Sequence, residues 1–298
     1  MQIMITLSEQ HAQFVTLGSG QRLCYATFGA EQGIPLLYFH GWPSSRLQAH
    51  SLDSLGKELG VTIYSPDRPG LGQSDHMENR VLQDWPSIVS EFMDLLGLPA
   101  AHLMGVSGGG PYALATACAL NDRILSTSIV CGAPPLAELE DRSAMIWPYR
   151  ALLKARPIMP ALLKPAIPLT RWIASKTYEE PPLSWFVSTL AQKDRDILKK
   201  DEANLFALYS FREALSKGAP GLIIDADAYT NRWDLDYTQI THPVHFWHGT
   251  ADQNIPFNMA QHLASQIPQA IPHWLEGEGH YSLPIQHSRD ILNCMLMA

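Results

Sequence analysis

The sequence predicts an α/β fold in which helices cover both faces of a mostly parallel sheet and a helical segment is inserted into the chain. Three observations predict this fold. Short apolar runs alternate with helix-like stretches up to residue 131, the alternation stops between residues 133 and 240, and it resumes over residues 241–298. Strand–helix alternation is typical of parallel sheets covered on both faces. Because the alternation resumes, an insertion is favoured over a separate second domain.

The expected division of the chain follows from this interpretation. Residues 1–133 and 241–298 form the sheet core, and residues 134–240 form a helical cap, or lid. Charge also marks the middle of the chain. Between Asp141 and Lys217 there are 13 Lys and Arg against 8 Asp and Glu, although the whole chain has a net charge of −8. Such a shift indicates a separate layer of the fold.

Short apolar or alternating runs are predicted as strands. The first two form a hairpin around a Gly-Ser-Gly turn at residues 18–20. The later runs are short and nearly continuous in apolar residues, as expected of strands buried on both faces. The predicted strands span residues 14–17, 23–27, 35–40, 61–65, 101–106, 124–131, 244–248 and 271–275.

Helices are predicted between these strands and within the middle segment. Pro111 stands in the first turn of one of them, where its missing N–H costs little. In the middle segment, the stretch WPYRALLKARPIMPALLKPAIPLTRWI has a proline every few residues, so short helices are expected there. The predicted helices span residues 45–59, 81–96, 111–120, 183–190, 204–215, 257–266 and 284–297.

Composition excludes several classes of protein. Apolar residues make up 46% of the 298 residues and charged residues 17%, which excludes a disordered chain. The net charge of −8 lacks the basic footprint of a nucleic-acid binder. No apolar run reaches the length of a membrane-spanning helix, and the first residues do not read as a secretory signal, so no stable membrane anchor is expected.

Four cysteines, Cys24, Cys118, Cys131 and Cys294, are widely scattered and form no CxxC pair. This pattern favours buried free thiols in a reducing cytoplasm over disulfides. No Cys/His spacing typical of a metal site occurs, so neither a metal nor an organic cofactor is expected. The sequence does not specify an oligomeric state.

One motif carries a candidate nucleophile. The segment Gly105-Val106-Ser107-Gly108-Gly109 matches G-x-S-x-G, follows a predicted strand and opens a predicted helix. This is the context of a nucleophile elbow, in which a serine stands on a tight, strained turn. Neighbouring chain passes close to the positions two before and two after the serine, so Gly105 and Gly109 meet a steric need. A Gly-rich turn without chemistry is the alternative.

A serine hydroxyl needs a neighbouring base, and the base needs a group that orients it. His280 lies in a Gly-rich loop after the last predicted strand, and Asp252 follows the strand before it. Both positions are at the carboxyl edge of the sheet. The chain order Ser107, Asp252, His280 is the Ser…Asp…His order of one large group of hydrolases. We therefore predict these three residues as the catalytic set.

The segment His40-Gly41-Trp42-Pro43 follows another predicted strand and is a candidate oxyanion hole. A tetrahedral intermediate needs two backbone N–H donors, of which one comes from the residue after the nucleophile, Gly108. We assign the other to Trp42, because Pro43 has no N–H and Gly41 supplies the turn. His40 is expected to brace the loop rather than to transfer a proton.

The loop DRPGLGQSD at residues 67–75 is also rich in glycine. A phosphate cradle would need a following Lys-Ser or Lys-Thr pair or a third glycine, and the loop has neither. A structural loop is the favoured interpretation.

Five segments, HGWP, DRPGLGQSD, GVSGGGPYALA, HGTADQNIP and GEGHYS, together resemble the α/β-hydrolase superfamily, in its compact cap-bearing branch of serine hydrolases and esterases. The resemblance runs from about residue 14 to the end, and the cap is its least characteristic part. It implies an eight-stranded, mostly parallel sheet with a Ser107–His280–Asp252 triad.

The resemblance also limits which reactions are expected. Epoxide hydrolases and haloalkane dehalogenases are similar around HGWP but use an aspartate nucleophile, where this chain has Ser107. Proline iminopeptidases carry a longer glycine-rich oxyanion motif, from which HGWP departs. The expected function is hydrolysis of a carboxylic ester or related small acyl substrate through an acyl-enzyme. The alternatives are a carbon–carbon bond hydrolase, a cofactor-free haloperoxidase-like enzyme, and a ligand receptor on the same fold.

The cap is expected to cover the site and set its specificity. Its aromatic and apolar residues either line an acyl pocket or form the cap's own core, the latter being favoured. Its positive charge either steers anionic substrates or belongs to a solvated face. The residues concerned are Trp147, Tyr149, Met159, Trp172, Trp185 and Phe186.

Overall fold

The structure is a computed structural model of the 298-residue chain. It describes residues 8–136, 143, 145, 147–155, 172–173, 175–217 and 220–297. No helix in these residues is long and apolar enough to cross a bilayer. All four cysteines are free thiols.

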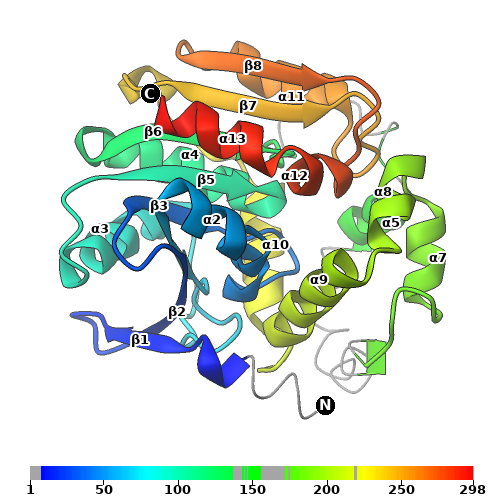
Figure 1. Ribbon diagram of the computed structural model, residues 1–298, viewed down its shortest axis with the longest axis horizontal. Coiled ribbons are helices and arrows are strands. Elements are labelled where there is room, and N and C mark those ends of the chain that lie inside the picture. Colours follow the sequence, from blue (N-terminus) through cyan, green and yellow to red (C-terminus); the bar gives the residue numbers. More distant parts are fainter. Residues whose placement is uncertain are drawn as a thin grey trace.

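Within the described residues, eight strands form a single sheet in the order β1-β2-β4-β3-β5-β6-β7-β8 (Figure 1). The pairs β1–β2 and β2–β4 are antiparallel, and every later pair is parallel. The strands are β1 (Gln13–Thr16), β2 (Arg22–Gly29), β3 (Ile34–Phe39), β4 (Val61–Pro66), β5 (Ala101–Val106), β6 (Ile124–Val130), β7 (Val244–Gly249) and β8 (Ala270–Leu275). The predicted fold class is confirmed.

Two apolar clusters cover the two faces of the sheet. One packs α3, α4 and α11 against it, with Trp85 and Phe92 fully buried. The other packs α2 and α13, with Ile291 and Leu292 buried against β4, β6 and β7. These helices are α2 (Asp53–Leu59), α3 (Trp85–Leu95), α4 (Gly110–Ala119), α11 (Phe257–Ser265), α12 (Ser282–Gln286) and α13 (Ser288–Leu296). β5 and β7 are buried along their whole length, which explains why their sequences are mostly apolar, with histidine as the polar residue in each.

A second group of helices lies between β6 and β7 in the chain. Figure 1 shows α5 and α7–α9 gathered beyond the arrowheads of β7 and β8, at the carboxyl edge of the sheet. They are α5 (Trp147–Ala155), α7 (Leu183–Ser188), α8 (Gln192–Leu198), α9 (Asp201–Ala214) and α10 (Pro220–Thr230). The division of the chain into a core and a cap at residues 133/134 and 240/241 stays a prediction.

Three predicted helices are divided in the structure, and the one predicted over residues 81–96 consists of a 3₁₀ helix, η2 (Leu82–Asp84), followed by α3. The segment predicted as one helix over residues 45–59 is a 3₁₀ helix, η1 (Arg46–Leu52), followed by α2. The side chain of Asp53 accepts the backbone N–H of Gly29 at 2.9 Å and so fixes the start of α2 on the sheet. The last predicted helix divides into α12 and α13, because His287 has non-helical backbone angles (φ −107°, ψ 15°).

Four short 3₁₀ helices complete the described elements. They follow β4, β5, α4 and α10 in the chain. Their bounds are η2 (Leu82–Asp84), η3 (Ser107–Gly109), η4 (Asn121–Arg123) and η6 (Tyr237–Gln239).

Candidate active site

Ser107 stands at the turn between β5 and α4, as the first residue of η3. Its φ of +53° is a left-handed backbone conformation that is strained for a residue other than glycine. The flanking glycines allow the close packing around it. A Cβ on Gly105 would lie 2.6 Å from the carbonyl oxygen of Gly109, and a Cβ on Gly109 would collide with the backbone of Phe39. The turn therefore requires glycine at both positions.

The structure brings Ser107, His280 and Asp252 together. His280 Nε2 lies 2.9 Å from Ser107 Oγ, and His280 Nδ1 lies 2.8 Å from Asp252 Oδ2. Asp252 follows β7, and its Oδ1 accepts the backbone N–H groups of Asn254 and Ile255, each at 2.9 Å. His280 follows β8. The three residues are 173 and 28 positions apart in the chain, and the parallel strands place them at one edge.

The protonation states suit proton transfer. Burial raises the pKa of the Asp252 carboxyl, but the adjacent His280 and the N–H donors outweigh it, so the pKa lies below its ordinary value and the group is ionised at neutral pH. Burial lowers the pKa of His280, but the charge of Asp252, its hydrogen bond and the charge of Asp194 outweigh that effect. The pKa of His280 is therefore raised above 6.5.

Cys131 and His248 flank Asp252. The Cys131 thiol is fully buried, and its donor atom lies within 4.8 Å of those of Asp252 and His280. Burial raises its pKa well above the ordinary value, so it stays neutral. His248 donates from Nε2 to the carbonyl of Ile255 at 2.8 Å, and burial lowers its pKa. The hydrogen bonds of Asp252 and His280 form the series that ends at Ser107, and Cys131 and His248 bond to backbone carbonyl oxygens beside it.

The loop after β3 lies against the nucleophile. A Cβ on Gly41 would be 3.4 Å from Ser107 Cβ. The backbone N–H of Gly41 is already donated to Gln48 Oε1 at 2.7 Å, which leaves the next residue, Trp42, as the position for an oxyanion donor. The indole of Trp42 donates to the carbonyl of Leu222 at 3.0 Å and ties the loop to α10. Gly108, the other candidate donor, is buried directly after Ser107.

His40 is fully buried beneath this loop. Its Nδ1 lies 2.9 Å from the carbonyl oxygen of Gly41, and its Nε2 accepts the backbone N–H of Arg68 at 3.4 Å. Burial and the nearby Arg68 guanidinium hold its pKa well below 6.5, so the ring is neutral. These contacts span two loops and leave both ring nitrogens occupied.

Asp194 is a site residue that sequence reasoning missed. It is 1% exposed on α8 and holds the loop that carries His280. Its Oδ2 accepts the N–H of His280 at 2.9 Å, and its Oδ1 accepts those of Tyr281 at 2.9 Å and Ser282 at 2.8 Å. A Cβ on Gly279 would collide with this carboxylate. The two partners are 86 positions apart, so no local sequence signal could have identified them.

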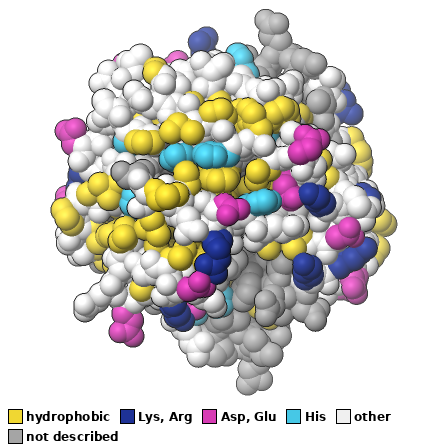
Figure 2. Space-filling model, turned by 45° about the horizontal axis from the view of Figure 1, so that its top comes forward, with side chains coloured by type: hydrophobic (Ala, Val, Ile, Leu, Met, Phe, Trp, Pro, Cys, Tyr) yellow, Lys and Arg dark blue, Asp and Glu magenta, His cyan; other side chains and the backbone are white. Residues whose placement is uncertain are grey.

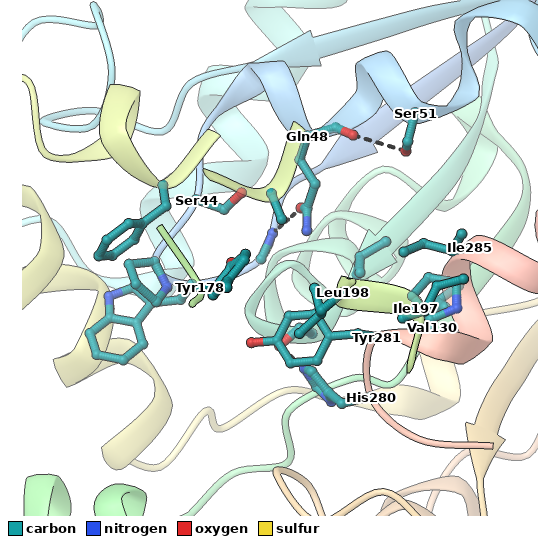
Figure 3. A pocket seen from close by; sticks show the side chains of 18 of the residues that line it. Ser44, Gln48, Ser51, Val130, Tyr178, Ile197, Leu198, His280, Tyr281 and Ile285 are labelled. Carbon is teal, nitrogen blue, oxygen red and sulfur yellow. Dashed lines mark hydrogen bonds between the residues drawn. The ribbon is translucent and has the colours of Figure 1, made fainter. Parts of the chain in front are cut away.

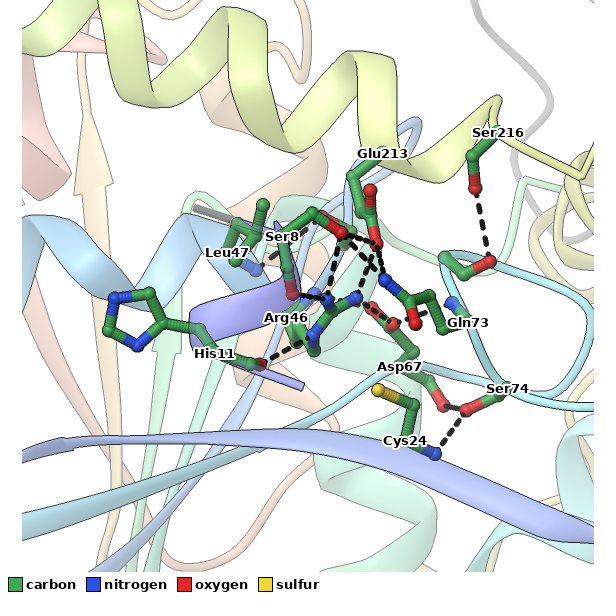
Figure 4. A network of polar contacts seen from close by, with 12 residues as sticks. Ser8, His11, Cys24, Arg46, Leu47, Asp67, Gln73, Ser74, Glu213 and Ser216 are labelled. Atoms are coloured by element: carbon green, nitrogen blue, oxygen red, sulfur yellow. Dashed lines mark hydrogen bonds and ion pairs between the residues drawn. The ribbon is translucent and has the colours of Figure 1, made fainter. Parts of the chain in front are cut away.

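Buried ion pairs connect the loop at residues 67–75 to the inserted helices. Figure 4 shows the Arg46 guanidinium between Asp67 and Glu213, at 2.6 and 2.7 Å from their oxygens. Gln73 donates its backbone N–H to Asp67 Oδ2 at 3.0 Å. Since a carboxylate of this chain occupies the interior of the loop, the loop is structural and does not cradle phosphate.

A second ion-pair network lies beside the first. Asp225 on α10 contacts the guanidiniums of Arg68 at 2.7 Å and Arg80 at 2.5 Å, and all three side chains are fully buried. The hydroxyl of Tyr112 also donates to Asp225, at 2.8 Å. Burial raises the pKa of the Asp225 carboxyl, but the two guanidiniums outweigh it and lower the pKa below the ordinary value.

A cavity of about 770 Å³ opens onto Ser107 and His280. Figure 3 shows Tyr178, Ile197, Leu198, His280 and Tyr281 among the residues that line it. Its walls are largely apolar, and the charged side chains among them are those of Lys200 and His280. The apolar side chains that line the cavity include those of Met104, Val106, Val130, Ile173, Leu183, Phe186, Phe211 and Ile285.

The aromatic and apolar residues named in the cap do not share one environment. Of the six named from the sequence, Phe186 lines the cavity. Trp147, Trp172 and Trp185 are exposed and belong neither to the cavity wall nor to a core. Met159 and the side chain of Tyr149 lie outside the described residues.

An eight-stranded, mostly parallel sheet with a serine, an aspartate and a histidine in that chain order is the arrangement of α/β-hydrolases. The sequence profile of the Alpha/beta hydrolase family matches residues 36–293, and the chain belongs to this family.

Individual relatives match only part of this chain, at low sequence identity. A non-heme chloroperoxidase of Streptomyces lividans is 29% identical over 132 residues, which cover 43% of this chain and 47% of that protein. A proline iminopeptidase of Lactobacillus delbrueckii subsp. bulgaricus is 30% identical over 121 residues, covering 39% and 40%. The chain thus matches less than half the length of these curated relatives. An esterase structure from Exiguobacterium antarcticum has a TM-score of 0.68 at 18% identity, over 96% of this chain and 98% of that chain, a likeness of fold.

Proposed function

We propose that this protein is a serine hydrolase that cleaves a carboxylic ester or related acyl compound. The observation that carries the proposal is the hydrogen-bonded series Ser107 Oγ, His280, Asp252 at the wall of a largely apolar cavity. A hydroxyl 2.9 Å from an imidazole that an ionised carboxylate orients is an activated nucleophile when that imidazole is unprotonated.

The proposed reaction proceeds in two halves. Ser107 Oγ attacks the substrate carbonyl while His280 Nε2 accepts its proton, and the backbone N–H groups of Trp42 and Gly108 stabilise the oxyanion. His280 then protonates the leaving alkoxide, which departs and leaves an acyl-enzyme. Water attacks the acyl carbon, giving a proton to His280, and the acid is released as Ser107 regains that proton.

The cavity supports a substrate with an apolar acyl or alcohol part. A volume of about 770 Å³ is in the range that holds small organic ligands. Its apolar walls favour hydrocarbon over charged groups, and Lys200 at its wall suits a carboxylate or other acidic group remote from the scissile bond.

The Ser107→Ala variant tests the nucleophile. We expect hydrolysis of p-nitrophenyl esters to fall by about 10⁴-fold or more, because the attacking oxygen is removed, while the circular dichroism spectrum stays unchanged. A fluorophosphonate probe should label the wild-type protein and not the variant. Near-wild-type turnover by the variant would overturn the assignment. Stoichiometric ligand binding without turnover or labelling in the wild-type protein would support a receptor instead.

Similarity to a non-heme chloroperoxidase favours one second candidate, perhydrolysis. In this reaction hydrogen peroxide replaces water as the attacker of the acyl-enzyme, which yields a peracid and free Ser107. The peracid then oxidises halide. We therefore expect a comparison of three assays to decide: p-nitrophenyl ester hydrolysis, bromide oxidation with an acyl donor and hydrogen peroxide, and cleavage of proline amides. The last is included because of the similarity to a proline iminopeptidase. Preferential turnover in either arm replaces ester hydrolysis as the main activity.

A further inference from the structure

Three side chains with metal-binding atoms meet on the sheet, away from the candidate active site. His245 is on β7, His273 on β8 and Cys294 on α13. In the register of β7 and β8, His245 pairs with Ile271 and Trp247 pairs with His273. The two histidines are therefore diagonal neighbours on one face of the sheet, and α13 packs on that face.

The spacing of the donor atoms fits a tetrahedral transition-metal ion. His245 Nδ1 lies 3.1 Å from His273 Nε2, and Cys294 Sγ lies 3.4 Å from the former and 3.9 Å from the latter. Zinc bonds of about 2.0–2.1 Å to nitrogen and 2.3 Å to sulfur, at tetrahedral angles, place two nitrogens about 3.3 Å apart and nitrogen and sulfur about 3.6 Å apart. The observed triangle requires shifts of only a few tenths of an ångström.

The donors are both ordered and accessible. The His273 ring stacks on Trp247, with ring centres 3.9 Å apart and an interplanar angle of 6°, which fixes its orientation. His245 is buried, whereas His273 and Cys294 are partly exposed, so an ion can enter from solvent. Figure 2, in which the β7–β8 side of Figure 1 is turned forward, shows histidine side chains among apolar ones on this face.

The charge states also suit a metal. Burial lowers the pKa of both imidazoles, and the charge of His273 further lowers the pKa of His245, so both rings are neutral. Burial raises the pKa of the Cys294 thiol. A bound dication stabilises the thiolate, so binding releases the thiol proton to solvent.

We propose that His245, His273 and Cys294 form a binding site for Zn²⁺ or a similar borderline-soft dication, with the remaining coordination position open to water. Two imidazoles and one thiolate are ligands that such ions prefer over Ca²⁺ or Mg²⁺. The ion would join α13 to β7 and β8, the last two strands in the sheet order, whose following loops carry Asp252 and His280. Its primary effect is on the stability of this edge of the fold.

The test uses the full-length protein freed of metal with a chelator. Titration with Co²⁺ should produce a thiolate-to-cobalt charge-transfer band that saturates at one ion per chain, and Zn²⁺ should displace it. Calorimetry in buffers of different ionisation enthalpy should detect proton release. Saturating Zn²⁺ should raise the melting temperature by several degrees, because the ion binds the folded chain preferentially.

Cys294→Ser is the test variant, and Cys118→Ser is its matched control, since both cysteines are half-buried thiols on helices. We expect the control to bind as wild type, and Cys294→Ser to lose the charge-transfer band and at least about 10-fold in affinity. A second variant, His273→Gln, should also weaken binding. Absence of the band in wild type, or its persistence in Cys294→Ser through another cysteine such as Cys131, would overturn the proposal. A circular dichroism spectrum and a cooperative melting transition like those of metal-free wild type show that each variant is folded.

Discussion

The sheet core and the helices inserted after β6 are held together by different forces. The core is closed by two apolar clusters, in which residues such as Trp85 and Ile291 are almost completely buried. The inserted helices α8, α9 and α10 each contact the core through a buried carboxylate, Asp194, Glu213 and Asp225 respectively. Apolar contacts are non-directional, whereas a buried carboxylate needs its own donors at fixed places.

The buried carboxylates fix the position of the inserted helices on the core. Burial of apolar surface favours contact between a helix and the core, but it does not fix the position of the helix along that surface. Asp225 pins α10 to two arginines and Asp194 pins α8 to three backbone N–H groups. We therefore expect the core to respond to substitution gradually and the carboxylate attachments to respond steeply.

Replacing Asp225 with Asn should have the largest effect. The variant keeps the shape of the side chain but removes the negative charge that both Arg68 and Arg80 contact in a fully buried place. We expect the free energy of unfolding to fall by about 3–5 kcal/mol, as urea denaturation would measure. The core comparator Ile129→Val removes one methylene and should cost about 0.5–1.5 kcal/mol. Equal losses in the two variants would abolish the distinction between the regions.

Asp194→Asn should act on catalysis more than on stability. The two carboxylate oxygens of Asp194 accept three backbone N–H groups of the His280 loop, whereas an amide has only one acceptor oxygen. We expect kcat for an ester substrate to fall about 10- to 100-fold with a smaller change in KM. Asp196→Asn, an exposed acid on the same helix, is the matched control and should behave as wild type. A parallel loss in both variants would point to general damage of α8.

The pH dependence of kcat/KM separates the charge effect of Asp194 from its effect on the geometry of the His280 loop. His280 must be neutral to accept the proton of Ser107, and its pKa is raised above 6.5, so kcat/KM of the wild-type protein should rise with pH through an inflection above 6.5. Because the charge of Asp194 contributes to raising that pKa, Asp194→Asn should move the inflection to lower pH. An unmoved inflection would mean that Asp194 acts through geometry alone.

The sequence predicts the fold and the candidate triad because both depend on local patterns. The glycines around Ser107 are required by backbone contacts within the turn and its neighbouring strand. The chain order of Ser107, Asp252 and His280 then follows from where each strand ends. Asp194 has no such signal, because an aspartate in a polar helix looks the same whether it faces water or accepts a backbone N–H from 86 positions away. Asp225 lies among apolar residues in α10, but nothing in that pattern identifies Arg68, 157 positions away, as its partner. Likewise, the composition of the middle segment could not reveal that Trp147 and Trp185 are exposed.

The attachment of α8 to the His280 loop also bears on how such enzymes are recombined. A chimera that exchanges the inserted helices for those of another hydrolase would keep the sheet, the elbow and all three triad side chains. It would nevertheless lose Asp194, which accepts three backbone N–H groups of the His280 loop, because Asp194 belongs to the exchanged part. Transplanting specificity between scaffolds of this kind therefore means grafting a supporting aspartate along with the new binding surface.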